Sequence, residues 1–118
     1  YLFDNGVDVA FGHDSLMDHW SLFGSGDTYQ KLNYFVQRFG YTDEWHLGQS
    51  LKYATGGLTS LTEEGCMQWP KVGDRANAIL VDAVSSAHLI ARKCPISTVI
   101  AQGVVVHQVE MVQKGALR

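Results

Sequence analysis

The chain is poor in proline and cysteine, carries no strong excess of charge of either sign, and contains no long apolar run. It has two prolines and two cysteines among 118 residues, and its formal net charge is −3. No apolar stretch approaches the roughly 20 residues of a membrane span, and no signal-peptide pattern opens the chain. The nine Lys and Arg residues are scattered along the sequence. We therefore expect a cytoplasmic protein with neither a nucleic acid nor a membrane as its partner.

The cysteines and histidines show no spacing typical of a metal site. Cys66 and Cys94 are far apart and form no CxxC or zinc-ribbon pattern, which favours two buried thiols in a reducing compartment. The five histidines include no His-x-His pair and no HExxH motif. They are His13, His19, His46, His88 and His107. We expect His46 and His88 to be surface or edge residues and His107 to be structural, and we do not expect a complete metal site within this chain.

The first residues predict one strand followed by a long loop. Residues 7–11 (V-D-V-A-F) are β-branched and aromatic and are bounded by glycine on both sides, which is typical of a strand. Residues 12–26 have no clear period and are rich in Gly, His and Asp. Loops of this length in compact domains tend to be functional, so this segment is a candidate site.

Helices should follow this loop. Asp27 has the character of an N-cap, with Gln30 completing a capping-box pattern, and Gly40 stands where a C-cap should be. The apolar residues at helical spacing between these caps are Leu32, Phe35, Val36 and Phe39. Thr42 should cap a second helix that ends before Gly56, and residues 58–64 predict one more short helix.

The second half of the sequence predicts a small unit made mostly of strands. Residues 78–81 (A-I-L-V) predict a buried strand, and Ser85 should cap a short helix that runs through Arg92. Two β-rich runs, residues 96–101 and 104–109, are joined by Gln-Gly, a favourable hairpin turn. Residues 111–112 are expected to extend a last strand.

These elements divide the chain at about residue 64. Residues 1–64 read as strand, loop and helices, which is one unit of a parallel α/β fold, whereas residues 65–118 read as the β-rich unit. A buried strand must pair its backbone groups, and strand 7–11 has no candidate neighbour nearby in the sequence. We therefore expect the chain, which begins at Tyr1, to be part of a larger protein.

Asp14 is the strongest candidate for a catalytic residue. It directly follows strand 7–11, and α/β folds gather their active sites at the carboxyl ends of their strands. A carboxylate there can ligate a metal or accept a proton from a bound water. An aspartate in this position can equally stabilise a loop turn, and spacing alone does not separate the two roles.

One longer run of residues resembles a known family. The run F-G-H-D-S-L-M-D-H-W-S-L-F-G-S-G-D, residues 11–27, is similar to the end of the last barrel strand and the following loop in cytosine-deaminase-like members of the amidohydrolase superfamily. That group includes bacterial cytosine deaminase and N-isopropylammelide amidohydrolase. K-V-G-D-R-A-N-A-I-L-V-D, residues 71–82, and A-Q-G-V-V-V, residues 101–106, are similar to parts of the family's β-sandwich domain.

The resemblance implies a fold and a set of roles. The fold would be the C-terminal part of a (β/α)8 barrel of the TIM type, in residues 1–64, plus the C-terminal part of a small composite β-sandwich. Asp14 falls on the family's metal-binding aspartate, which also carries the proton of the hydrolytic water to the leaving amine. Trp20 falls on a tryptophan that packs against the substrate or pocket wall. Ser15 stands where cytosine deaminase has a second acidic residue facing the pocket, which leaves the pyrimidine specificity open.

The implied reaction is the hydrolytic deamination of a nitrogen heterocycle such as cytosine, with one divalent ion, Zn or Fe. The family's histidine ligands and catalytic glutamate lie on earlier strands and are not in this chain. Their absence implies a chain that is inactive alone and that needs the N-terminal remainder of the enzyme as a partner. We also expect the enzyme to be a homo-oligomer. Two alternatives stay open: an amidohydrolase of N-alkylamino-triazines such as N-isopropylammelide, or of creatinine-type substrates, and a stand-alone module without catalytic activity.

Overall fold

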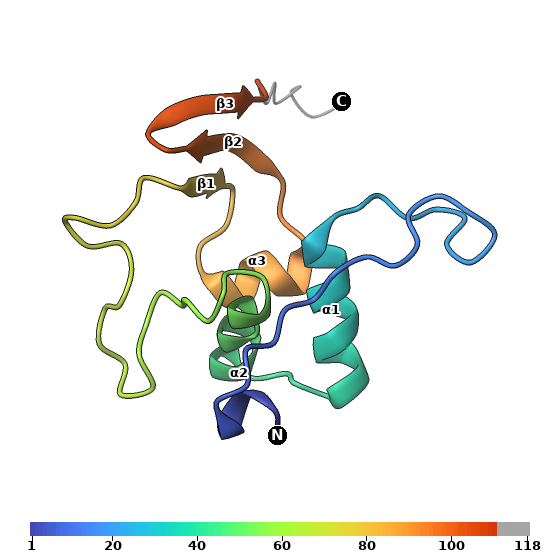
Figure 1. Cartoon of the computed structure of the whole chain (residues 1–118), viewed down its shortest axis with the longest axis horizontal. Coiled ribbons are helices and arrows are strands. Elements are labelled where there is room, and N and C mark those ends of the chain that lie inside the picture. The colour runs from blue at the N-terminus through green and yellow to red at the C-terminus, as the bar shows by residue number, and fades with distance from the viewer. Residues whose placement is uncertain (111–118) are drawn as a thin grey trace, which may run out of the picture.

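The computed structural model describes residues 1–110, which form a group of short helices beside a small antiparallel sheet (Figure 1). The sheet lies at one end of the molecule and the N-terminus at the other (Figure 1). The elements in chain order are η1 (Phe3–Asn5), α1 (Thr28–Phe39), α2 (Glu44–Gln49), η2 (Ser50–Tyr53), β1 (Ala78–Val81), α3 (Ser86–Arg92), β2 (Ile96–Ala101) and β3 (Val104–Gln108). No helix within residues 1–110 is both long and apolar enough to cross a bilayer.

Helix α1 forms where its capping residues predict it. The Asp27 side chain accepts a hydrogen bond from the backbone N–H of Tyr29, and Gly40 ends the helix in the left-handed conformation with a φ of 69°. The reciprocal half of a capping box does not form, because the Gln30 side chain donates instead to the Tyr34 hydroxyl. The N-cap and C-cap are therefore confirmed, whereas the role expected for Gln30 is wrong.

Helix α2 begins one residue later than predicted. Asp43, not Thr42, is the N-cap, and its side chain accepts from the backbone N–H of His46 at 2.9 Å. Aspartate is a better N-cap than threonine, since its carboxylate also complements the positive end of the helix dipole. The helix continues as η2 and ends before Gly56, which has a positive φ.

The short helix predicted for residues 58–64 does not form. An isolated bridge pairs Leu61 with Met67, and the Thr62 N–H donates to the Cys66 carbonyl at 2.8 Å. The Thr59 hydroxyl donates to the carbonyl of Leu61, two residues on. Such local side-chain bonds compete with the helical ladder, and here they stabilise a tight turn.

The sheet confirms the predicted hairpin. Strand β2 is central, and both β1 and β3 pair with it in antiparallel fashion. Gln102 and Gly103 both have positive φ, which suits a two-residue turn whose twist matches that of the strands. The Asn77 side chain fastens this turn by accepting from the Gln102 N–H at 2.7 Å.

Strand β1 is present but is not buried as predicted. Its two central residues, Ile79 and Leu80, are exposed, and so are the valines of β3. The reason is visible in Figure 1, where the sheet lies at one side of the helices instead of between two covering layers. Residues 111–112, which were expected to extend a strand, lie outside the described residues.

The strand predicted at residues 7–11 is also absent as a strand. The segment forms neither a helix nor a strand, and few of its backbone groups are paired: the Phe11 N–H donates to the Tyr53 carbonyl at 3.0 Å and the Val7 N–H to the Leu2 carbonyl. A strand exists only beside a neighbour that shares its ladder, and none is present within residues 1–110. The long loop predicted for residues 12–26 is confirmed.

The core is small and joins α1 to α3. Its buried members are Tyr29, Leu32, Val36, Leu89, Ile90 and Cys94. Cys94 is buried as predicted, but Cys66 is exposed, so the expectation of two buried thiols is half wrong. His46 on α2 is exposed and His88 on α3 is partly buried, in agreement with their expected surface and edge positions, while His107 is exposed on β3.

A large surface remains outside this core. The accessible area is 9257 Å², whereas a compact monomer of this length exposes about 6,400 Å². The radius of gyration is 15.9 Å, compared with about 13.5 Å for a compact domain of 118 residues. The chain thus keeps more surface, much of it apolar, than a protein of this size usually does.

Candidate functional site

The site predicted from the sequence lies on the loop of residues 12–26, which projects from the helices in Figure 1. The loop begins at a firmly packed residue. The Phe11 ring stacks on Tyr53 with centroids 4.8 Å apart and meets Phe35 edge-on at 5.0 Å. Together with the backbone bond from Phe11 to Tyr53, these contacts fix where the loop leaves the helices.

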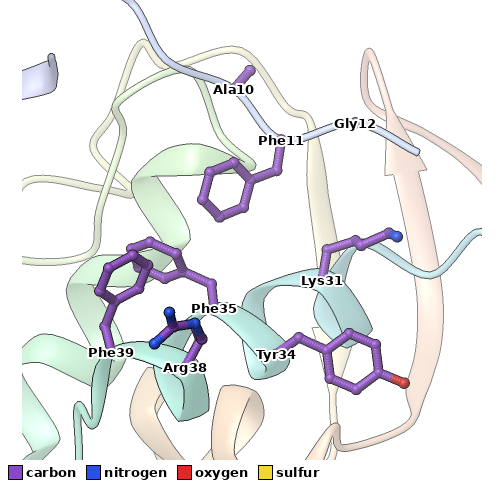
Figure 2. A pocket seen from close by; sticks show the side chains of 8 residues that line it. All are labelled: Ala10, Phe11, Gly12, Lys31, Tyr34, Phe35, Arg38 and Phe39. Carbon is purple, nitrogen blue, oxygen red and sulfur yellow. The ribbon is translucent and has the colours of Figure 1, made fainter. Parts of the chain in front are cut away.

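Figure 2 shows the side chains around this anchor. The Phe11 ring points toward Phe35 and Phe39 on α1, whereas the amino group of Lys31 points away from the rings. A hollow of about 450 Å³ lies between residues 10–12 and α1. Both aromatic and basic side chains line it, the basic ones being Lys31 and Arg38.

Asp14 lies three residues beyond the anchor and is exposed. Its carboxylate forms no ion pair with any residue in the described part of the chain. An exposed carboxylate held close to a rigid aromatic anchor can accept a proton or ligate an ion without first breaking an internal contact.

Ser15 and Trp20 occupy the same loop but do not form a closed pocket with Asp14. Ser15 is half-buried, and the Trp20 side chain is 81% exposed. The Trp20 indole contacts the His19 ring, with centroids 5.2 Å apart. A second hollow of about 250 Å³ between this loop and α1 is lined by His13 and Lys31 among others, and by none of Asp14, Ser15 and Trp20. The structure thus brings the three predicted residues onto one loop without enclosing them.

Two nested turns give the loop its shape. The Asp18 carboxylate accepts from the backbone N–H of Trp20 at 2.9 Å and of Ser21 at 3.0 Å. The Gly24 N–H in turn donates to the Ser21 carbonyl at 3.3 Å. A Cβ on Gly24 would stand 2.0 Å from the Leu16 carbonyl oxygen, so only glycine fits there.

The hydrogen bonds to the Asp18 carboxylate also favour its ionised form. Chiefly because the Trp20 amide donates to it, the pKa of the Asp18 carboxyl is lower than its ordinary value. The pattern D-x-W-S is the kind of local sequence that forms such a turn, because aspartate side chains readily bond to backbone N–H groups two residues on.

One buried polar atom near the site has no partner. Nε2 of His13 is buried and makes no hydrogen bond within residues 1–110. Nothing in the sequence distinguishes this histidine from the other four. Its neighbour Asp14 is exposed, so the two side chains differ in environment, one against the protein and one toward solvent.

The described residues do not hold a metal ion by themselves. No group of three or more His, Cys, Asp or Glu side chains is placed for metal binding within residues 1–110. Asp14 can supply one carboxylate ligand, which is fewer than a zinc or iron site requires.

Comparison with known proteins gives partial matches. No family model matches the chain. It is 45% identical over 94 residues to the uncharacterised protein YahJ of Escherichia coli strain K12, a match that covers 80% of this chain and 20% of YahJ. The chain thus spans about a fifth of the length of this relative.

Solved structures give a match over almost the whole chain. The structure is similar to 5-methylcytosine deaminase from Klebsiella pneumoniae liganded with 5-fluorocytosine, with a TM-score of 0.68 and 22% identity, over 98% of this chain and 28% of the deaminase. The same deaminase liganded with phosphonocytosine matches with a TM-score of 0.67. The chain has the fold of part of this deaminase. That fold is a small α/β arrangement with a three-stranded antiparallel sheet, and the described residues include no barrel.

Proposed function

We propose that this chain is the C-terminal portion of a metal-dependent amidohydrolase that hydrolytically deaminates a nitrogen heterocycle such as cytosine. The observation that carries the proposal is the agreement of two independent features. The residues from Phe11 to Asp27 resemble the last barrel strand and loop of cytosine-deaminase-like enzymes, and the fold matches part of a 5-methylcytosine deaminase over 98% of this chain.

Asp14 is the proposed catalytic residue and one metal ligand. Its exposed carboxylate, three residues beyond the fixed Phe11, is free to take the proton of the hydrolytic water and deliver it to the leaving amine. A bound Zn or Fe ion would make that water acidic enough to ionise near neutral pH. Since the described residues supply one ligand, the others have to come from the rest of the enzyme.

Trp20 and Ser15 are the proposed substrate contacts. The exposed indole of Trp20 offers a flat apolar face to a heterocyclic ring. Ser15 replaces an acidic residue of the resembling enzymes, and its hydroxyl can donate or accept a hydrogen bond but carries no charge. This exchange leaves the choice between cytosine and an N-alkylamino-triazine as substrate open.

The excess surface of the chain supports a partner. Besides Trp20, four exposed apolar side chains lie on the loop: Leu16, Met17, Leu22 and Phe23. Residues 8–10 carry backbone groups that a neighbouring strand could pair. We propose that the N-terminal remainder of the enzyme covers these groups, with residues 1–64 completing a (β/α)8 barrel and residues 65–118 completing a β-sandwich. A cytoplasmic homo-oligomer, inactive when reduced to this chain, remains part of this proposal.

The test is a product assay on the full-length protein. Purified enzyme loaded with Zn or Fe is incubated with cytosine, with ammonia as the readout, and with N-isopropylammelide, with the released alkylamine as the readout. Turnover of either substrate supports the proposal and decides between the two substrate classes. No release of amine from either substrate, in protein shown to contain metal, contradicts it.

The alternative of a non-catalytic module is tested on the 118-residue chain. Its specific support is the core shared by α1 and α3, which is formed within this chain alone. A monomer that binds neither a metal nor the separately expressed N-terminal remainder favours the module. A chain that binds that remainder favours the enzyme portion.

A further inference from the structure

We infer that Asp18 is a positioning residue that holds Trp20 in the orientation in which its indole meets the substrate. This inference rests on the proposed function, because it assumes that Trp20 contacts a heterocycle. It goes beyond that function by assigning a role to a residue that touches neither the reacting atoms nor the ring.

The first argument is that little else determines where the indole points. The Trp20 side chain is 81% exposed, and the aromatic ring that it meets within the described residues is His19, itself exposed on the same loop. The backbone conformation fixes the direction of the Cα–Cβ bond and limits which rotamers a side chain can adopt. The backbone at Trp20 is therefore the main restraint that this loop places on the indole.

The second argument is that Asp18 fixes that backbone. Its carboxylate accepts from the amides of Trp20 and Ser21, at 2.9 and 3.0 Å, and the Ser21 N–H also donates to the Asp18 carbonyl at 3.2 Å. One side chain thus orients two successive peptide units that flank the tryptophan. Charge-assisted bonds from backbone N–H groups to a carboxylate are stronger than neutral ones, so the turn keeps its shape at the surface.

The third argument is that the turn is built into the rest of the loop. The Ser21 carbonyl, held in place by the first turn, accepts from Gly24, and Gly24 lies directly against the Leu16 carbonyl. These contacts connect the loop between Asp14 and α1 into one unit, and Asp18 forms the first of its two turns. A change at Asp18 should alter how Trp20 is presented while Asp14, which lies before this unit, keeps its place.

The chemical role can be tested by a cycle of four variants in the full-length enzyme. Asp18→Ala should raise KM about 3- to 10-fold and change kcat less than about 2-fold, since it alters substrate placement and not the proton transfer. Asp18→Asn should restore KM, because its side-chain oxygen still accepts the two N–H bonds. If Asp18 acts through Trp20, adding Asp18→Ala to Trp20→Ala should raise KM no further than Trp20→Ala alone.

A matched control exists elsewhere in the chain. The Asp74 carboxylate accepts from the Lys71 N–H at 2.7 Å and closes a similar exposed turn, far from the loop in sequence. Asp74→Ala removes the same kind of bond and should leave KM unchanged. An Asp18→Ala effect no larger than that of Asp74→Ala, or one that adds fully to Trp20→Ala, overturns the inference.

A direct readout of the turn separates this inference from the proposed function. In the 118-residue chain labelled with 15N at tryptophan and serine, Asp18→Ala should shift the Trp20 and Ser21 amide signals upfield and raise their exchange rates, while Asp18→Asn should shift them less. Unchanged amide signals in Asp18→Ala overturn the role of Asp18 whatever the enzyme does. Normal shifts combined with a wild-type enzyme that hydrolyses no heterocycle instead refute the proposed function, and with it the part of the inference that involves substrate.

Discussion

Asn33 ties the two halves of the core together, and its replacement gives a sharp test of the fold. Its side chain is 6% exposed on α1. Its amide group donates to the carbonyls of Ile90, at 3.0 Å, and Ala91, at 3.3 Å. Both carbonyls belong to the last turn of α3, where no further helical N–H is available to satisfy them.

The expected cost of Asn33→Ala follows from these bonds. Each hydrogen bond contributes about 0.5–1.5 kcal/mol net, and a buried carbonyl left without a donor costs about 1–3 kcal/mol. Some water can reach the end of α3 once the side chain is shortened, which reduces the second cost. We therefore expect Asn33→Ala to lower the free energy of unfolding by roughly 2–3 kcal/mol. Asn33→Asp should cost at least as much, because a carboxylate cannot donate to these carbonyls and meets the negative end of the helix dipole.

Urea denaturation of the 118-residue chain, followed by circular dichroism, measures these differences. Arg38→Ala is the matched control, because Arg38 is exposed on the same helix and makes no hydrogen bond to α3 or to Asn33 within residues 1–110. It should cost no more than about 0.5 kcal/mol. An Asn33→Ala variant as stable as Arg38→Ala would show that α1 and α3 are not joined by these bonds.

Two further predictions concern local structure. Gly24→Ala should disrupt the candidate loop and lower the activity of the full-length enzyme more than Gly12→Ala does. A Cβ on Gly24 overlaps the Leu16 carbonyl, whereas a Cβ on Gly12 meets no atom within 4 Å. Equal activity of the two variants would contradict this prediction. The pKa of the Asp43 carboxyl is lowered, chiefly because the backbone N–H of His46 donates to it. The ionised carboxylate therefore stabilises α2 fully above the ordinary pKa of 3.8, and this stabilisation is lost as the pH falls through the lower pKa of the folded state. Asp43→Asn should remove this acid-dependent loss, as measured by the pH dependence of the His46 amide signal, and an unchanged dependence would contradict the assignment.

The elements that the sequence predicted well are those fixed by nearby residues. The caps at Asp27, Gly40 and Ser85 each act within a few residues, and α1 and α3 form where these caps place them. The hairpin turn at residues 102–103 is equally local. Element type and position follow from such signals because they need no information from distant parts of the chain.

Two failures, the strand at residues 7–11 and the burial of β1, share one cause, which is dependence on a neighbouring strand or layer. The absent helix at 58–64 and the shifted N-cap of α2 instead reflect local hydrogen bonds. Residues 7–11 have the composition of a strand, but no strand lies beside them within the described residues, so no ladder forms. Strand β1 has a core-like sequence, yet Leu80 is exposed because no described layer covers that face. Composition specifies what a segment can bury, whereas burial itself requires a partner.

The candidate site was also predictable only in part. The resemblance singled out Asp14, Ser15 and Trp20, and all three lie on one projecting loop. The bonds from Asp18 to the loop backbone are of the kind that the local pattern D-x-W-S favours. The buried Nε2 of His13, which has no hydrogen-bond partner within residues 1–110, could not be read from residue types, because it depends on the folded path of the loop.

The central claim is that Asp14 performs the proton transfer of a hydrolytic deamination, and one measurement tests it most directly. Steady-state turnover of the heterocycle that the full-length enzyme accepts is compared between wild type and Asp14→Asn, with metal content and circular dichroism checked for both. Loss of the general base is predicted to lower kcat by at least about 100-fold in a folded protein. A folded Asp14→Asn enzyme that retains nearly the wild-type kcat would contradict the account.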